Sequence, residues 1–252
     1  MSNAQLFSTV AREYANFRPG YPPELFAWLA RSAPARGAVW DCGCGSGQAS
    51  TALAEHFSVV YATDVAPEQV AAAKPHPRVR YAVAPAEHSG LGDASVDLVT
   101  VAQALHWFDV EAFYAEARRV ARPGALLAVW NYPRPQFVDA RLDQCFLDFY
   151  SGVVGPYWPP ERRHIEANYT TLPFPFQELP HPEFGLQLNW NLDQVIGYVS
   201  SWSATARYRK ALGSDPVPLL RESLGAIWPA AGASVAIRMP IGLRAGHLRP
   251  GG

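Results

Sequence analysis

The sequence predicts an α/β protein with a doubly wound, mostly parallel sheet and helices on both faces. Three observations predict this class. Short β-branched runs alternate with helical patterns from residue 38 to residue 131, about half of the 252 residues are apolar, and a glycine-rich turn follows the first run. Such alternation is typical of strand-helix-strand units around a parallel sheet.

Seven strands and five helices are expected along the chain. The strands are expected at residues 38–41, 59–63, 79–83, 96–102, 125–131, 184–189 and 234–243. The helices are expected at residues 48–57, 67–74, 109–120, 192–202 and 218–228. Asp109 is the expected N-cap of the third helix, and Pro123 and Gly124 separate that helix from the fifth strand.

Charge and cysteine content disfavour several function classes. The formal net charge is −1 with no block of Lys or Arg, which disfavours a nucleic-acid partner. No run approaches the roughly 20 apolar residues of a membrane span, and the first thirty residues do not form a signal peptide, so a cytoplasmic protein without a membrane partner is expected. The odd set of Cys42, Cys44 and Cys145 is no disulfide framework, and no further ligands at finger-like spacing predict a metal site.

The run Asp-Cys-Gly-Cys-Gly-Ser-Gly at residues 41–47 leaves a strand and enters a helix, where doubly wound folds bind nucleotides. The glycines alone do not decide which nucleotide. The pyrophosphate of a dinucleotide would meet Asp41 as a repulsive neighbour, and Gln48 stands where a dinucleotide motif needs its third glycine. S-adenosylmethionine carries an ammonium and a sulfonium instead, which Asp41 can attract directly or through water. The loop therefore favours S-adenosylmethionine over a nicotinamide cofactor.

Acidic residues follow the next two strands. Asp64 stands where a carboxylate can accept hydrogen bonds from both ribose hydroxyls. Glu87 can receive the adenine amino group, while the backbone beside it contacts the ring. Residues 103–109, after the fourth strand, lie where the methyl group should face its acceptor.

Taken in order, these motifs resemble those of class I S-adenosylmethionine-dependent methyltransferases of the type 11 group. The motifs are residues 41–47, Asp64, residues 86–87, residues 97–99 and residues 119–124. The resemblance covers residue 14 to about residue 131 and implies a Rossmann-like fold. The cofactor contacts that it implies are Asp41, Gly43, Cys44, Gly45, Asp64, Val65, Ala86, Glu87 and Gln103.

Shorter stretches are similar to the subgroup that includes trans-aconitate methyltransferase, whose members methylate small carboxylic acids. These stretches are residues 18–22, 104–109, 155–158 and 201–204. The resemblance implies a small-molecule acceptor, with a carboxylic acid as the first choice.

The domain organisation expected is one methyltransferase domain over residues 1–252. Its parts are an N-terminal helical segment (1–35), a cofactor-binding core (36–132), a cap (133–191) and a C-terminal completion of the sheet (192–252). The cap is rich in proline and aromatic residues, which is typical of either a binding cap or an irregular connection. Whether the protein is a monomer or a homodimer is left open.

The candidate acceptor residues are aromatic side chains that can wall a pocket and arginines that can pair with a carboxylate. They are Tyr14, Arg18, Tyr21, Trp107, Tyr157, Trp158, Arg162 and Trp202, with Arg163 as a further arginine. Core packing and surface solvation are the alternatives for each single residue.

His106 is the candidate catalytic residue. It can act as a general base, orient an acceptor carboxylate, or simply pack in its loop. Methyl transfer to a carboxylate needs no base because that nucleophile is already ionised at neutral pH. A phenol or amine acceptor would need one. The remaining alternatives are a nicotinamide-dependent oxidoreductase, which Asp41 and Gln48 disfavour, and a binding module without turnover.

Overall fold

The computed structural model describes residues 19–248, and this part of the chain divides into two units. The sheet unit contains residues 20–133, 163–184 and 240–248, and the helical unit contains residues 134–162 and 185–239. These limits differ from those expected for the cap, because residues 163–184 belong with the sheet unit and residues 192–239 with the helical unit. The single-domain description stays a prediction.

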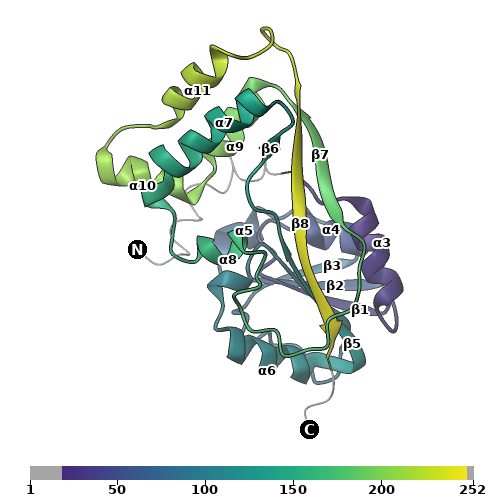
Figure 1. Ribbon diagram of the computed structural model, residues 1–252. Helices are drawn as coiled ribbons and strands as arrows, with labels where there is room; N and C mark the ends of the chain where they lie inside the picture. Colours follow the sequence, from purple (N-terminus) through teal and green to yellow (C-terminus); the bar gives the residue numbers. More distant parts are fainter. Residues whose placement is uncertain (1–18, 249–252) are drawn as a thin grey trace. The chain divides into compact units, whose positions relative to one another are not determined.

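The sheet unit is a doubly wound α/β structure, as expected. Its strands are β1 (Ala38–Cys42), β2 (Val59–Asp64), β3 (Val79–Val83), β4 (Val96–Ala102), β5 (Ala121–Asn131) and the last part of β8 (Val235–His247). The order is β3-β2-β1-β4-β5-β8, with β1 to β5 parallel and β8 antiparallel to β5 (Figure 1). The carboxyl ends of β1, β2 and β4 therefore share one edge, which is where such sheets bind ligands.

Helices cover both faces of this sheet. They are α3 (Pro23–Ser32), α4 (Gln48–Ala54), α5 (Pro67–Ala71), η1 (Leu105–Trp107), α6 (Val110–Val120) and α8 (Arg162–Glu166), the last of which begins at the unit boundary. Asp109 caps α6 as expected, since its side chain accepts a hydrogen bond from the backbone N–H of Ala112. Because every residue of β1 is buried, that strand is buried on both faces.

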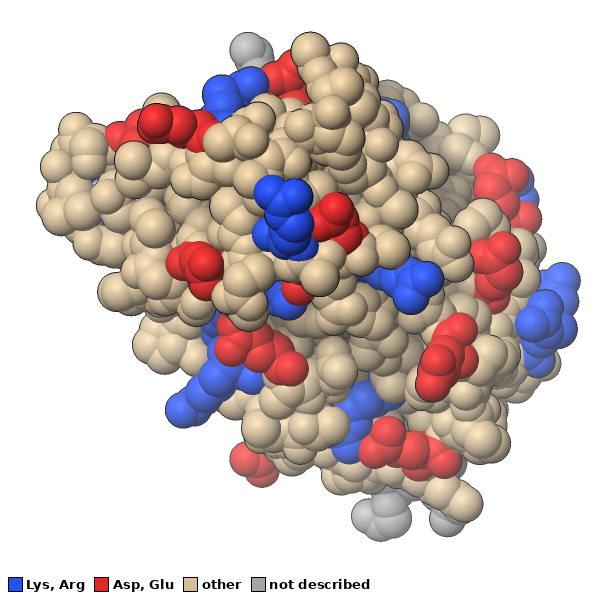
Figure 2. Space-filling model, turned by 45° about the horizontal axis from the view of Figure 1, so that its top comes forward, with Lys and Arg blue, Asp and Glu red and all other residues tan. Residues whose placement is uncertain are grey.

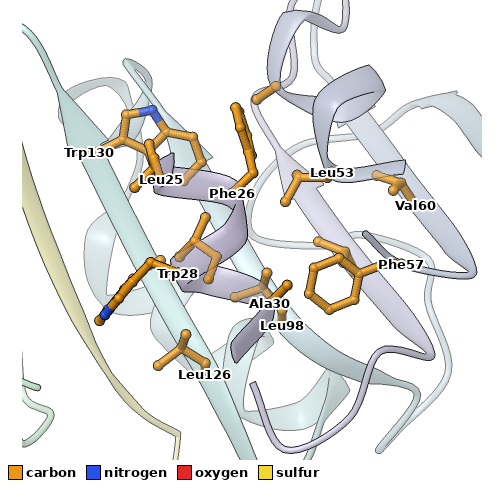
Figure 3. Packing of buried hydrophobic residues seen from close by; sticks show 14 of the residues in the cluster. Leu25, Phe26, Trp28, Ala30, Leu53, Phe57, Val60, Leu98, Leu126 and Trp130 are labelled. Atoms are coloured by element: carbon orange, nitrogen blue, oxygen red, sulfur yellow. The ribbon is translucent and has the colours of Figure 1, made fainter. Parts of the chain in front are cut away.

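Alternation along the strands divides the core of the sheet unit into two layers. Leu126 and Trp130 of β5 pack with α3 and α4, and Figure 3 shows Leu25, Phe26 and Trp28 of α3 on this layer. The residues that alternate with them point to the other face of the sheet and pack with α6 in the second layer. Leu127 and Val129 are two of these residues. The two layers hold the strand ends, and with them the loops of the site, in place.

The helical unit combines helices with two strands and the first part of β8. Its elements are β6 (Gln136–Phe137), α7 (Ala140–Asp148), η2 (Phe149–Val153), η3 (Gly155–Tyr157), β7 (Phe184–Trp190), α9 (Leu192–Ser200), α10 (Ser203–Leu212) and α11 (Val217–Gly225). Both β6 and β7 pair with β8, so the sheet has eight strands where seven were expected. The short β6, α7 and α10 were not expected, and the segment after Tyr132 is more regular than its composition indicates.

Several expected boundaries are wrong by a few residues. The helices expected at 48–57 and 67–74 end at Ala54 and Ala71. Pro75 disfavours a helical Lys74, so the second of these has a local reason to stop early. The fifth strand begins at Ala121, and β8 continues four residues past the expected end because it pairs with β5 up to His247.

Candidate functional site

The glycine-rich loop turns sharply between β1 and α4. Gly43, Gly45 and Gly47 all have positive φ, at 67°, 53° and 84°. Left-handed residues of this kind are accessible to glycine at little cost. The loop is tied to β2 by a hydrogen bond of 2.9 Å from the Cys44 N–H to the Thr63 carbonyl.

Gly43 sits in the tightest part of this loop. A Cβ at Gly43 would lie 2.6 Å from the Cβ of Ala104 and 3.0 Å from Cζ of Phe108, both of which follow β4. A Cβ at Gly47 would overlap the hydroxyl of Tyr81. The loop after β1 is thus packed directly against the chain after β4, where the methyl group was expected to face its acceptor.

Asp41 is fully buried at the end of β1. Its two carboxylate oxygens accept hydrogen bonds from Ser50 Oγ at 2.6 Å and from Thr100 Oγ1 at 2.9 Å. Burial raises the pKa of Asp41 to about 6, with a smaller increase from the charge of Asp64 and an opposing effect of the two hydroxyls. Because the carboxylate is buried and both oxygens accept hydrogen bonds, the expected attraction of the methionine part, directly or through water, stays a prediction. Asp41 joins β1, α4 and β4.

Asp41→Asn is expected to raise the melting temperature at neutral pH. Because the pKa of Asp41 is higher in the folded protein than its ordinary 3.8, the native state loses stability as the pH rises through the window from 3.8 to about 6. The free energy of unfolding falls by up to ~3 kcal/mol over this window, and asparagine, which does not titrate, avoids this decrease. Thermal unfolding of both proteins at pH 7.5 and pH 4 tests this, and a difference in melting temperature that does not shrink at pH 4 would contradict it.

Asp64 at the end of β2 supports the same loop. Its Oδ2 accepts a hydrogen bond from the Gly45 N–H at 2.8 Å, and its Oδ1 accepts one from the Ala66 N–H at 2.9 Å. Burial raises the pKa of Asp64, and these backbone hydrogen bonds oppose the increase. Each carboxylate oxygen has two lone pairs, so a ribose hydroxyl can still be accepted at each. Val65 beside it is exposed.

Glu87 follows β3 and is partly buried beside the buried Ala86. Its Oε1 accepts a hydrogen bond of 3.0 Å from the backbone N–H of Asp109, the N-cap of α6. The carboxylate therefore connects the loop after β3 to the start of α6. This contact leaves Oε2 and the second lone pair of Oε1 for the expected hydrogen bond with adenine.

Gln103 directly follows β4 and has a φ of 59°, which is rare for a residue other than glycine. Its N–H donates to the Trp130 carbonyl at 2.9 Å, and its Nε2 donates to the Tyr132 carbonyl at 3.3 Å. Strained backbone of this kind clusters at functional sites. The backbone at Gln103 was expected to meet the methionine part.

His106 lies buried in η1, and Nδ1 is 3.1 Å from the hydroxyl of Tyr169. The ring of Trp107 lies 4.5 Å from that of His106 between centroids. Tyr169 is itself fully buried. The pair with Tyr169 fixes the imidazole ring, which suits an orienting role at least as well as that of a base.

Four of the candidate acceptor residues lie in the helical unit. The ring of Trp158 is 5.2 Å from that of Trp202 and 5.2 Å from that of Tyr150. The guanidinium of Arg162 lies 4.5 Å over the Trp158 ring, and its Nε donates to the Tyr150 hydroxyl at 2.8 Å. Tyr157 packs against Tyr208, at 4.9 Å. Tyr150, Trp158, Arg162 and Trp202 form what we call the aromatic-arginine cluster.

The other candidates are more scattered. Tyr21 packs edge-on against Trp130 in the sheet unit, at 5.5 Å, and therefore contributes to the core. Arg163 is exposed beside His164. Tyr14 and Arg18 lie outside the described residues.

Four polar partners were missed from the sequence. They are Ser50, Thr100, Tyr150 and Tyr169. Thr100 and Asp97 are the polar residues of the otherwise apolar β4, and this pattern could have singled out Thr100.

Comparison with known proteins decides the family. A protein from Dictyostelium discoideum that is described as a methyltransferase is 33% identical over 221 residues, which cover 86% of this chain and 84% of that protein. The family described as "Methyltransferase domain" matches residues 40–129. The chain belongs to the class I S-adenosylmethionine-dependent methyltransferases. A solved structure from Anaeromyxobacter dehalogenans, described as a type II methyltransferase, shares 47% identity with this methyltransferase. Its TM-score is 0.86 over 93% of this chain and all of that one.

The loop chemistry fits the cofactor of this methyltransferase. Ordinary side chains at Gly43 and Gly47 would collide with their neighbours, and three acids surround the loop. Burial and the nearby charge of Asp41 raise the pKa of the Cys42 and Cys44 thiols, so both stay protonated and do not repel a ligand. In residues 19–248 no three side chains of His, Cys, Asp or Glu come together as a metal site, and no helix there is long and apolar enough to cross a membrane.

Proposed function

We propose that this methyltransferase transfers the methyl group to a carboxylate of a small-molecule acid. Bound S-adenosylmethionine supplies an electrophilic methyl group on a sulfonium, and a carboxylate oxygen that takes it forms a methyl ester without release of a proton. In this proposal Asp64, Glu87 and the glycine-rich loop bind the cofactor. Positioning supplies most of the catalysis, because the nucleophile is already charged.

The observation that supports this acceptor is the aromatic-arginine cluster. Arg162 is held over an indole ring, and a guanidinium can pair with a carboxylate bidentately. Beside it, the Trp158 indole nitrogen is buried with no hydrogen-bond partner among the described residues. An indole N–H is a donor only, so the cluster combines a cation with a donor that lacks an acceptor. A carboxylate oxygen can accept from this indole N–H, and a carboxylate can pair with a guanidinium.

The charges on one face of the molecule favour a small acceptor over a polyanion (Figure 2). On the face drawn in Figure 2, acidic and basic side chains are interspersed, with no broad area of a single sign. Together with the net charge of −1, this distribution lacks the basic footprint that nucleic-acid binding requires.

Arg162→Gln is expected to raise KM for a carboxylic acid about 10- to 100-fold, because a charge-assisted hydrogen-bonded pair is worth roughly 1.5–3 kcal/mol. Arg162→Lys should recover only part of this, since an ammonium lacks the planar fork. The measurement is formation of S-adenosylhomocysteine and methyl ester from a panel of mono-, di- and tricarboxylic acids.

The matched control is Arg141→Gln, an exposed arginine in the first turn of α7. It should leave KM within twofold of wild type, and all three variants should bind S-adenosylhomocysteine normally. Equal losses in the Arg162 and Arg141 variants would remove Arg162 from the acceptor site. Absence of any methyl ester across the panel would overturn the carboxylic acid proposal.

The variant His106→Ala distinguishes a carboxylate acceptor from a phenol or amine acceptor. With a carboxylate acceptor, His106→Ala should retain substantial turnover and kcat/KM should vary little between about pH 6 and pH 8, because no base is titrated. Loss of turnover by 100-fold or more with retained cofactor affinity would favour a phenol or amine acceptor and a base at His106.

A further inference from the structure

Two side chains at the end of β5 are buried without partners. Trp130 and Asn131 are both 0% exposed. Within residues 19–248, neither Trp130 Nε1 nor the Oδ1 and Nδ2 atoms of Asn131 have a hydrogen-bond partner. Buried polar groups in native proteins are almost always paired, because an unpaired one loses its water without compensation. A buried side-chain amide with neither its oxygen nor its nitrogen paired therefore indicates that a ligand binds there.

Asn131 lies at the carboxyl ends of the parallel strands, the edge where such sheets bind ligands. Asn131 is the last residue of β5, next to β4. Its neighbour Trp130 accepts the hydrogen bond from the N–H of Gln103, the left-handed residue that follows β4. Open α/β sheets bind their ligands just outside the carboxyl ends of such strands. The unpaired amide thus lies beside the segment where methyl transfer is expected.

The two side chains point to opposite faces of the sheet. Successive residues of a strand alternate, and Trp130 packs with Phe26 of α3 on the first core layer. Asn131 accordingly shares its face with Val129, which belongs to the layer that also contains Tyr169. The unpaired amide of Asn131 therefore lies on the face of the sheet where His106 and Tyr169 pack, and the unpaired indole N–H of Trp130 lies on the other face.

A turn in a strained conformation packs on this face. Asn131 is directly opposite Gly242 of β8, and a Cβ at Gly242 would lie 2.6 Å from the Cβ of Asn168. Residues opposite each other in antiparallel strands share a face, so the turn at Asn168 lies over the face that carries Asn131. Asn168 and Tyr169 have φ of 48° and 61°, two successive left-handed residues that are not glycine. Backbone strain of this kind clusters at functional sites.

An amide is a selective partner because it presents a donor and an acceptor together. An ionised carboxylate alone can accept from Nδ2 but is repelled by Oδ1. A hydroxyl next to a carboxylate supplies the missing donor. We propose that Asn131 is a specificity-determining residue that binds a hydroxy acid, with the hydroxyl donating to Oδ1 and a carboxylate oxygen accepting from Nδ2. This inference rests on the proposed carboxylic acid acceptor and narrows it to acids that carry a hydroxyl.

The test compares acids that differ by one hydroxyl, malate with succinate and citrate with tricarballylate. Wild-type protein should prefer the hydroxylated member by at least tenfold in kcat/KM, because a site built for a hydroxyl leaves its polar groups unpaired with the analogue. Asn131→Leu, a substitution of similar size, should bring both ratios to within twofold of one. Its affinity for S-adenosylhomocysteine should be unchanged, and its melting temperature without ligand should be equal or higher because no hydrogen bond is lost.

Asn191→Leu is the matched control. Asn191 Oδ1 caps α9 by accepting a hydrogen bond from the Gln194 N–H at 2.9 Å, so this variant should have a lower melting temperature and an unchanged hydroxyl preference. A fall in melting temperature of Asn131→Leu as large as that of Asn191→Leu would mean that the amide is paired structurally, and would overturn the inference.

The kinetic outcomes separate this inference from the proposed function. If the protein methylates the acids but its kcat/KM ratio of hydroxylated to non-hydroxylated acid is near one, Asn131 has no role in specificity. The same follows if Asn131→Leu keeps the wild-type ratio. Either result would leave the proposed carboxylic acid acceptor in place. Methylation of none of the acids would overturn the proposed acceptor, and the assignment of Asn131 with it.

Discussion

Gly43→Ala is expected to reduce the affinity for S-adenosylhomocysteine by at least 100-fold. The new Cβ would lie 2.6 Å from the Cβ of Ala104, a backbone-attached atom that cannot rotate away. A left-handed alanine costs roughly 1–2 kcal/mol, and overpacking adds about 1–3 kcal/mol, so the loop will shift to relieve the contact. A 100-fold change corresponds to about 2.8 kcal/mol, which lies within this range. Isothermal calorimetry with S-adenosylhomocysteine measures the effect.

Gly90→Ala separates the cost of a left-handed alanine from the cost of overpacking. Gly90 has a φ of 75°, close to the 67° of Gly43, but a Cβ there would meet nothing within 4 Å. This control should lose roughly 1–2 kcal/mol of stability and keep its cofactor affinity within twofold. If the two alanine variants bound the ligand equally well, the packing of the loop against Ala104 would have no part in cofactor binding.

Asp64→Ala should weaken binding of S-adenosylhomocysteine by a similar factor, for a different reason. The substitution removes the carboxylate that orders the backbone at Gly45 and Ala66, together with the expected acceptor of the ribose hydroxyls. Hydrogen bonds to charged groups contribute roughly 1.5–3 kcal/mol each, so two such losses exceed a 100-fold effect. NADH, titrated in parallel, should bind neither protein.

Asp139→Ala is the control for this variant. Asp139 accepts hydrogen bonds from the Arg141 and Leu142 N–H groups as the N-cap of α7, so it also uses a carboxylate to bind two backbone donors. Its loss should cost about 1 kcal/mol of stability without changing cofactor affinity. Unchanged affinity in Asp64→Ala would show that the ribose is held elsewhere.

The sheet unit was predictable because its strands are short apolar runs with turn residues between them. Strands β1 to β5 appear where the runs predict them, and β3 and β4 have the expected bounds. Helix α7 was missed although Leu142, Phe146 and Phe149 repeat at helical spacing, because the surrounding proline and aromatic residues suggested irregular structure. Local composition was a poor guide there, since packing within the helical unit stabilises the helix.

The grouping of the candidate cofactor residues was predictable for a related reason. Residues at the carboxyl ends of parallel strands meet at one edge, so Asp41, Asp64 and Glu87 could be grouped from strand ends alone. The contacts of Asp41 with Thr100 and of His106 with Tyr169 join residues 59 and 63 positions apart. No local pattern encodes such a pairing, so the buried state of Asp41 had to come from the structure.

The last strand, β8, has a consequence for synthesis on the ribosome. It pairs with β5 through residues 242–247 and with β6 through Ile237 and Arg238, so each unit needs it. Until β8 has been synthesised, the edge of β5 that pairs with it has backbone N–H and C=O groups without strand partners. Neither unit can therefore complete its strand pairing until residues 235–247 have been translated, and pairing between strands so far apart in sequence slows folding.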